Sequence, residues 1–179
     1  MITMYANRLE MYKAVFPQGG IGAELGVQFG QNVLSLLTTQ PKRLFCVDPW
    51  EVMDGSYAAA TTIASLYPEI EMVRDWDTKW IPTLPDKILD WVYIDTLHTY
   101  DQTMLELELL RPKVKSIIAG HDFVCTAAHS HSVADEWGAG VMLAVLEVLS
   151  KGWCEMVAMT RSGPDGHDQF PSWAIRITS

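Results

Sequence analysis

Acidic residues, histidines and closely spaced glycines recur where the apolar stretches of this sequence end. They are Glu24 with Gly26 and Gly30, Asp48, Asp75 with Asp77, Asp95 with His98, and His121 with Asp122. A carboxylate only accepts hydrogen bonds and can hold two donors at once. Histidine exchanges a proton near neutral pH, and glycine lets a ligand approach the backbone. These residue types therefore predict a small-molecule site with groups for binding and for proton transfer.

The spacing of the glycines narrows the class of ligand. The dinucleotide fingerprint G-x-G-x-x-G, if it began at Gly20, would need its third glycine where the chain has Leu25. The pattern present is acidic-x-Gly-x-x-x-Gly, formed by Glu24, Gly26 and Gly30. Because no Lys or Arg lies near this turn in the sequence, we expect a nucleoside ligand without a phosphate.

Apolar stretches and helix breakers predict the elements that position these residues. Strands are predicted over residues 21–25, 44–47, 70–73, 91–94, 116–119, 154–159 and 173–177, and helices over 4–16, 31–39, 56–67, 100–110 and 132–150, the last one interrupted at Gly138 and Gly140. Strands that alternate with helices are typical of an open parallel sheet with helices on both faces. The last two strands are too close for a crossover helix and predict an antiparallel hairpin. Ligands of such sheets lie at the carboxyl ends of the strands, so the polar residues should meet there.

Composition argues against several classes of protein. Lys plus Arg number 13 against 22 for Asp plus Glu, a formal charge of −9, so a basic track for nucleic acid is not expected. The three cysteines lack C-x-x-C spacing and predict neither a disulfide framework nor a zinc cluster. The most apolar helix, over 141–149, is far shorter than the roughly 20 residues that span a bilayer. We expect a single-domain, cytoplasmic protein with no membrane or nucleic-acid partner.

Three motifs taken together resemble a known family. They are the glycine turn of residues 24–30, I-D-x-x-H-x-Y over residues 94–100 and G-H-D-F over residues 120–123, with Asp48 at the end of the second predicted strand. Over residues 19–122 the chain resembles class I S-adenosyl-L-methionine-dependent methyltransferases, in particular the small bacterial group called methyltransferase family 24. The resemblance implies an α/β, Rossmann-like fold: a doubly wound, mostly parallel seven-stranded sheet with an antiparallel C-terminal strand, in three αβα layers. It also implies one domain with an N-terminal helix (1–18), a cofactor-binding core (19–152) and a terminal β-hairpin (153–179).

The resemblance implies that S-adenosyl-L-methionine binds at the glycine turn and at the loops after the next two strands. Glu24 would hold polar groups near the methionine part, and Asp48 would accept from both ribose hydroxyls. For adenine, Asp75 or Asp77 would accept from the exocyclic amine, and Trp76 or Trp50 would cover the ring. The implied cofactor-binding set is Glu24, Gly26, Gly30, Asp48, Pro49, Asp75, Trp76, Asp77 and Asp95. Without a ligand, the same residues would form only tight turns and helix caps.

The reaction side of the implied site contains Asp95, His98 and His121. Methyl transfer from a sulfonium is an in-line displacement, so the protein mainly orients the acceptor and removes its proton. Either histidine would serve as that base, or His121 would only cap the strand end. Metal-dependent relatives bind a divalent metal such as Mg²⁺ through positions that correspond to Asp95 and Asp122. His121 replaces one acidic residue of that set, which argues against Mg²⁺ because this ion prefers oxygen ligands.

We therefore expect a methyltransferase that acts on a small molecule or glycan at a hydroxyl oxygen. Two other functions remain open: a non-catalytic S-adenosyl-L-methionine-binding domain, and a nucleotide-binding oxidoreductase, which the missing third glycine disfavours. The predicted roof of the site consists of the loops 123–131, with His129 and His131, and 161–171. Such a roof leaves the site open or completed by a second copy of the chain in a homo-oligomer.

Overall fold

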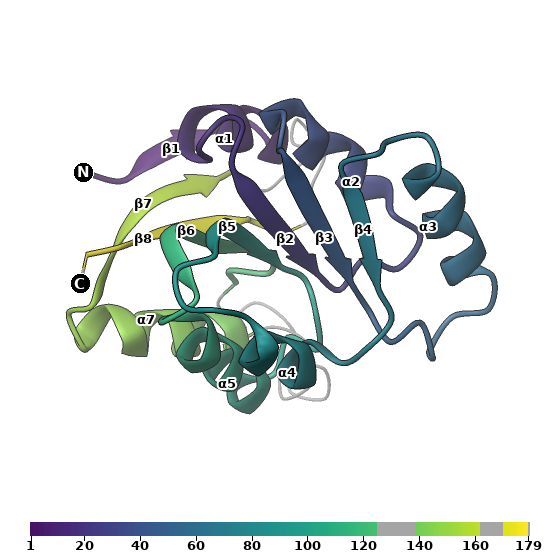
Figure 1. Cartoon of the computed structure of the whole chain (residues 1–179). Helices are drawn as coiled ribbons and strands as arrows, with labels where there is room; N and C mark the ends of the chain where they lie inside the picture. The colour runs from purple at the N-terminus through teal and green to yellow at the C-terminus, as the bar shows by residue number, and fades with distance from the viewer. Residues whose placement is uncertain (125–138, 162–169, 179) are drawn as a thin grey trace.

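The computed structural model describes residues 1–124, 139–161 and 170–178, and its strands form one mixed sheet (Figure 1). Within these residues the sheet has eight strands in the order β1-β7-β8-β6-β5-β2-β3-β4. The strands are β1 (Thr3–Tyr5), β2 (Ile21–Leu25), β3 (Arg43–Val47), β4 (Ile70–Val73), β5 (Leu89–Ile94), β6 (Val114–Gly120), β7 (Cys154–Thr160) and β8 (Trp173–Ile177). The helices are α1 (Arg8–Val15), α2 (Gln31–Leu36), α3 (Ser56–Ala64), α4 (Asp77–Trp80), α5 (Tyr100–Leu110) and α7 (Ala139–Ser150), with short 3-10 helices at Leu37–Thr39 and Ile81–Thr83.

The predicted fold class is confirmed. Strand β8 pairs antiparallel with β6 and with β7, and every other pairing in the sheet is parallel. The core is divided between the two faces of the sheet. One apolar cluster contains side chains of α4, α5 and α7, and the other contains side chains of α1, α2 and α3. The result is three αβα layers, and Figure 1 shows α4, α5 and α7 grouped on one side.

Two details of the predicted elements need correction at the N-terminus. The sheet has eight strands rather than seven, because β1 pairs in parallel with β7. The first helix begins at Arg8 instead of residue 4, since the Asn7 side chain caps it by accepting from the Glu10 amide at 3.0 Å. The Glu10 carboxylate in turn accepts from the Ala6 amide at 3.2 Å, which completes a reciprocal cap. The residues before this cap are therefore available to pair as a strand.

Helix α7 is continuous through Gly140, where a break was predicted. A Cβ at this position would lie 2.4 Å from the Tyr100 amide nitrogen, so the glycine lets α7 approach the start of α5 closely. The first part of the predicted helix 132–150, with Gly138, and the loop of the C-terminal hairpin lie outside the described residues. None of the helices in the described ranges has the length and apolar character that crossing a membrane requires.

A stack of aromatic rings attaches α1 to the centre of the sheet. The buried Trp91 of β5 is paired in register with Gly22 of β2, and its ring lies over the glycine. Phe16 stacks on Trp91 with 4.6 Å between ring centroids, and Tyr12 stacks on Phe16 at 5.0 Å. Since a Cβ at Gly22 would lie only 2.2 Å from the Trp91 ring, the stack requires glycine here.

We predict that Gly22→Ala destabilises the protein by about 1–3 kcal/mol, because the Trp91 ring must move out of a packed core. A strand glycine replaced by alanine would otherwise gain stability from the smaller entropy of the unfolded chain. The free energy of unfolding is measured by urea denaturation. The matched experiment introduces Gly22→Ala into a Trp91→Leu background, where the cost should be smaller. An equal cost in both backgrounds would show that the Trp91 ring is not the cause.

Candidate active site

The predicted polar residues meet at one edge of the sheet, at the carboxyl ends of β2, β3, β5 and β6. From β2 the chain builds β3 and β4 to one side and then crosses to form β5 and β6 on the other. The order of the strands therefore reverses between β2 and β5, which is where open α/β sheets bind ligands. Glu24 from β2 and Asp95 after β5 lie on the two sides of this point.

The glycine turn after β2 is held against both neighbouring strands. Gly26 has φ +82°, and its amide donates to the Val47 carbonyl at 2.9 Å. The Asp95 amide donates to the Leu25 carbonyl at 2.8 Å. A Cβ on Gly26 would lie 2.0 Å from the Asp95 carbonyl oxygen, so the contact between the two turns already excludes any other residue. The fold itself requires this glycine, in addition to any need of a ligand.

Asp48 joins the glycine turn to the loop after β3. Its Oδ2 accepts from the amides of Val27 and Gln28 at 2.9 and 3.0 Å, and its Oδ1 accepts from the Trp50 amide at 2.6 Å. A carboxylate offers about four acceptor positions, so roughly one remains for a ligand hydroxyl. Asp48 thus has a structural role in these two turns, as the alternative without a ligand allowed, and its predicted contact with ribose stays a prediction.

A cavity of about 330 Å³ opens between the glycine turn and the loops that follow β3, β4 and β5. Its lining includes the predicted residues Gly26, Asp48, Pro49, Trp50, Trp76, Asp77, Asp95 and His98, together with Val52, Met53 and Leu97, which were not predicted. Gly30 and Asp75 line neither this cavity nor the second one described below. Of the two candidate aspartates, Asp77 faces the cavity, while the Asp75 side chain is exposed and accepts from the Trp76 amide.

Asp77 belongs to a buried group of polar side chains that sequence reasoning missed. Gln102 donates to Asp77 Oδ2 at 3.3 Å and to Glu106 Oε1 at 2.8 Å, and Thr96 donates to the same Glu106 oxygen at 2.6 Å. Burial, and then the neighbouring Asp77 carboxylate, raise the pKa of Glu106 well above its ordinary value. Burial and the Asp77 carboxylate therefore favour the protonated form of Glu106, which lies beside Asp77 and Gln102 of the cavity lining. No motif of the sequence analysis included Glu106.

A second cavity, of about 200 Å³, lies across the glycine turn and is more polar. Its lining is Arg8, Glu24, Gly26, Val27, Gln28, Gln31, Asn32 and Asp95, of which Gly26, Gln28 and Asp95 also line the first cavity. Arg8 was not predicted, since it precedes every motif. The two cavities therefore form the two ends of one site around a shared turn.

Glu24 is the most deeply buried acid of the second cavity, with 1% of its surface exposed. Asn32 donates to its Oε1 at 2.8 Å, whereas Oε2 has no hydrogen-bond partner among the described residues. Burial raises the pKa of Glu24 to about 8, and the bond from Asn32 only partly opposes this shift. A buried acceptor without a donor is costly, so Glu24 is suited to receive a donor or a cation from a ligand.

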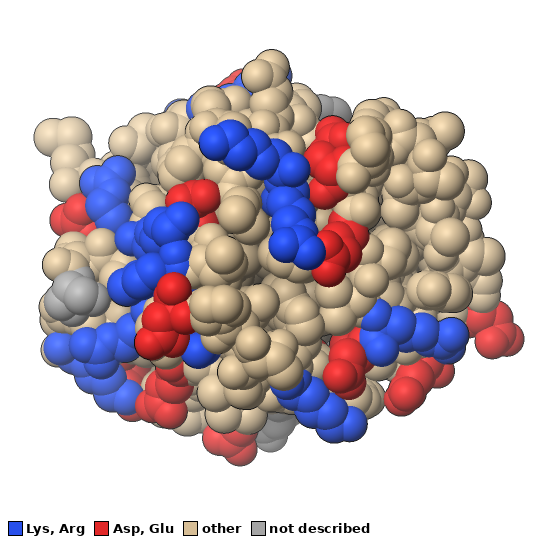
Figure 2. Space-filling model, viewed as in Figure 1, with Lys and Arg blue, Asp and Glu red and all other residues tan. Residues whose placement is uncertain are grey.

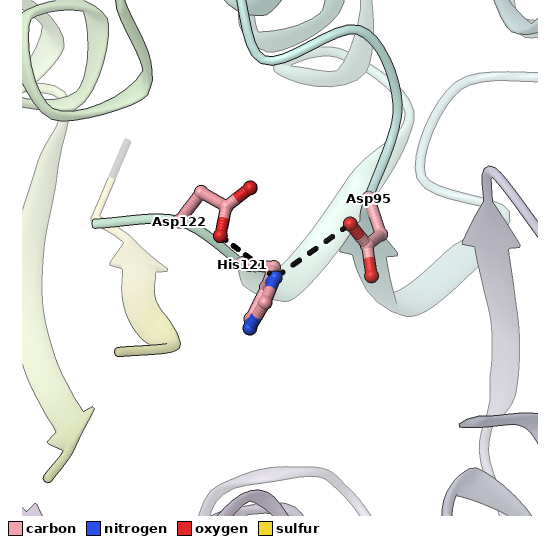
Figure 3. A group of neighbouring side chains, drawn as sticks. All are labelled: Asp95, His121 and Asp122. Atoms are coloured by element: carbon pink, nitrogen blue, oxygen red, sulfur yellow. Dashed lines mark ion pairs between the residues drawn. The ribbon is translucent and has the colours of Figure 1, made fainter. Parts of the chain in front are cut away.

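A cluster of two acids and two histidines follows β5 and β6. It consists of Asp95, His98, His121 and Asp122. His121 Nδ1 lies 2.9 Å from Asp122 Oδ1 and 3.8 Å from Asp95 Oδ1 (Figure 3). His98 bridges the same two acids, with Nε2 2.9 Å from Asp95 Oδ1 and Nδ1 3.2 Å from Asp122 Oδ2. The structure thus brings together every residue that was predicted for the reaction side.

The two histidines of this cluster differ in the partners of their ring nitrogens. Both ring nitrogens of His98 face carboxylates, whereas His121 Nε2 has no hydrogen-bond partner within the described ranges. Burial lowers the pKa of His121, but the contact with Asp122 and the charges of Asp95 and Asp122 outweigh it, so the net pKa is raised. Of the two rings, His121 therefore has the nitrogen without a hydrogen-bond partner in the described ranges, but this atom is buried and His121 lines neither cavity, whereas His98 lines the larger one.

The cluster also has a composition that metal ions recognise. One ligand atom from each of Asp95, His121 and Asp122 lies within 4.8 Å of the others. Mixed imidazole and carboxylate ligands suit Mn²⁺, Fe²⁺ or Zn²⁺ better than Mg²⁺. The predicted metal ligands Asp95 and Asp122 are thus joined by a nitrogen donor, and metal binding stays a prediction.

Left-handed backbone conformations gather at this edge. Six described non-glycine residues have positive φ, and four of them belong to the site: Gln28 (+46°), Trp50 (+49°), His98 (+56°) and Asp122 (+57°). Such conformations cost of the order of 1–3 kcal/mol each and tend to be retained at functional sites. Asp48 and the bond from the Trp50 indole nitrogen to the Gln28 carbonyl, at 2.9 Å, hold two of them in place.

The fold is similar to that of many solved methyltransferases. A 1,6-didemethyltoxoflavin N1-methyltransferase from Burkholderia thailandensis, solved with S-adenosylhomocysteine, has a TM-score of 0.68 at 13% identity, over 96% of this chain and 76% of that one. A candidate rRNA methylase from Clostridium thermocellum gives 0.66 at 13%, over 95% of both chains. A candidate caffeoyl-CoA O-methyltransferase from Staphylococcus aureus gives 0.65 at 10%, over 94% and 78%. At these identities the likeness shows the fold alone.

The amino-acid sequence of residues 23–123 identifies the family of the chain. A search among curated protein sequences found no match. The model of a methyltransferase-domain family, in contrast, matches residues 23–123, more than half of the chain. The matched segment begins in β2 and ends just after the His121 and Asp122 pair, so it contains the glycine turn, the larger cavity and the reaction-side cluster. The chain belongs to this family of methyltransferase domains.

Proposed function

We propose that the chain transfers a methyl group from S-adenosyl-L-methionine to a hydroxyl oxygen of a small molecule or glycan. The observation that carries the proposal is the pair of unlike cavities around one glycine turn. The larger has Val52, Met53 and Leu97 in its lining and, among described residues, no Lys or Arg, which suits a nucleoside without phosphate. The smaller contains Glu24 and suits the charged methionine part.

The larger cavity supports specific nucleoside contacts. Asp48 has an acceptor position left for one ribose hydroxyl, next to Pro49. Asp77 is the aspartate that faces the cavity, and we assign it the exocyclic amine of adenine. Trp76 is half-buried and covers the ring in this proposal, because the Trp50 ring is buried and its indole nitrogen already donates to the Gln28 carbonyl.

The reaction-side cluster supports transfer to oxygen, since a hydroxyl must lose its proton as the methyl group arrives. His121 Nε2 is the proposed base. Asp122 orients the ring through Nδ1, and His98 holds the carboxylates of Asp95 and Asp122 in position. In the metal-dependent form of the proposal, Asp95, His121 and Asp122 hold a divalent cation that would orient the acceptor oxygen and lower its pKa.

Surface charge supports a small acceptor over a nucleic acid. The chain has a formal charge of −9. On the face shown in Figure 2, Lys and Arg side chains lie beside Asp and Glu side chains and form no continuous basic track. Binding to a phosphate backbone depends on clustered cations, so this face supports an acceptor without one.

We predict that S-adenosyl-L-methionine and S-adenosylhomocysteine both bind, as measured by isothermal titration calorimetry. Asp48→Asn should weaken both at least about tenfold, because an amide nitrogen cannot accept from backbone amides. Asp75→Asn is the matched control: its side chain is exposed and lines neither cavity, so affinity should not change. The absence of binding at millimolar ligand would contradict the proposed function.

We predict that cofactor binding at pH 6.5 releases a proton from Glu24. The pKa of about 8 means that ligand-free Glu24 is protonated at this pH, and the cationic amino group of the ligand favours the carboxylate. Affinity should therefore rise with pH and level off above about 8. Because the folded pKa lies above the unfolded one, this residue also makes the ligand-free protein less stable as pH rises towards 8.

Proton release is measured by calorimetry in two buffers that differ in ionisation enthalpy. The Glu24→Gln variant has no titrating carboxyl group at this position and should release none. Binding of the wild-type protein with no net proton release would mean that Glu24 does not meet the amino group.

We predict that the wild-type protein methylates hydroxyl compounds in a panel of sugars and catechols with tritiated cofactor. His121→Gln should lower the rate about 10²–10⁴-fold while S-adenosylhomocysteine still binds normally. Parallel assays in EDTA and with added Mn²⁺ or Mg²⁺ separate the two forms of the proposal: a rate that EDTA abolishes and a metal restores indicates a bound cation. Transfer to nitrogen only, or an unchanged rate in His121→Gln, would contradict the assignment.

A further inference from the structure

We propose, on the basis of the function proposed above, that Arg8 of α1 binds the carboxylate of the cofactor's methionine part. The smaller cavity would then recognise a zwitterionic amino acid, with Arg8 for its negative end and Glu24 for its positive end. Arg8 lies outside residues 23–123, so a segment that precedes the matched family domain completes the cofactor site.

The charges around the smaller cavity match an amino acid. Arg8 is its one cationic lining residue in the part of the chain that the structure describes, and the acids Glu24 and Asp95 line it as well. An α-amino acid carries one positive and one negative group, whereas a nucleoside carries neither. A guanidinium presents a planar fork of donors that fits a carboxylate. The cavity therefore has one complementary group for each end of the ligand.

Glu24 provides an independent sign of a ligand. Its Oε2 is buried without a hydrogen-bond partner in the described ranges, although its Oε1 is satisfied by Asn32. Tyr12 donates to the Asn32 side-chain oxygen at 3.1 Å, which orients the Asn32 amide so that its nitrogen faces Glu24. Hydrogen bonds from Tyr12 to Asn32 and from Asn32 to Glu24 thus leave Oε2 of Glu24 as the open position. Tyr12 belongs to α1, the helix that also contains Arg8.

Helix α1 is held firmly enough to place Arg8. The reciprocal cap of Asn7 and Glu10 fixes its first turn, and Arg8 is the first residue of that turn. At the other end, Phe16 stacks on Trp91 in the centre of the sheet. Arg8 is only partly exposed, and its charge opposes the raised pKa of Glu24. Both ends of α1 are therefore anchored, and the anchored helix places Arg8 in the lining of the smaller cavity.

The test compares a ligand that has the amino acid end with one that lacks it. S-adenosylhomocysteine and 5′-methylthioadenosine share the nucleoside and the sulfur, but only the former carries a carboxylate and an amino group. We predict that Arg8→Met weakens S-adenosylhomocysteine about 10- to 100-fold, the usual effect of losing a hydrogen bond to a charged group. Its affinity for 5′-methylthioadenosine should stay within about twofold of the wild-type value.

Lys13→Met is the matched control, since it removes the same charge from an exposed position of the same helix. It should bind both ligands as the wild type does. Equal S-adenosylhomocysteine affinity in Arg8→Met and wild type would overturn the role of Arg8 and leave the proposed function standing. An equal loss for both ligands in Arg8→Met would also overturn it, because Arg8 would then support the fold. If the wild type binds neither ligand, the proposed function itself fails.

Discussion

The contact between the Gly26 backbone and the Asp95 carbonyl decides where three adjacent strands of the sheet, β5, β2 and β3, end together. A side chain at Gly26 would enter the Asp95 backbone, and the Gly26 amide is bonded to Val47 at the end of β3. With β2, β3 and β5 ending at one point, the residues that follow them must converge. Glu24, Asp48 and Asp95 are near one another for this reason, although they are far apart in the sequence.

Asp48 and α1 support the carboxyl ends of β2, β3 and β5 from opposite sides. Asp48 accepts three backbone amides and so stabilises two loops that contain left-handed residues. Their conformational cost is offset by bonds that exist before a ligand arrives, which is the condition for a preorganised site. On the other side, Trp91 and Phe16 fasten α1 to the sheet, and Tyr12 extends the contact to Asn32 and Glu24. Binding groups on both sides of the turn are thus supported by packing rather than by the ligand.

The sequence by itself determined the class of the fold and the edge that contains the site. Continuous apolar stretches mark buried parallel strands, and polar residues at their ends stand out against them. Four elements have the predicted bounds: β2 (Ile21–Leu25), β4 (Ile70–Val73), α5 (Tyr100–Leu110) and β8 (Trp173–Ile177). Their signals are local, a run of apolar residues or a capping residue, so no knowledge of distant partners was needed.

Only the tertiary structure decided features that depend on distant partners. Strand β1 is three residues long and exists because β7 lies beside it, at the other end of the chain. The pKa of Glu106 is raised only because packing buries its side chain and places Asp77, from another helix, beside it. Arg8 lies at the smaller cavity because Tyr12 and Phe16 pack the helix α1 against Tyr93 and Trp91 of β5. A side chain's burial and partners are set by packing between segments remote in sequence, and no local pattern records them.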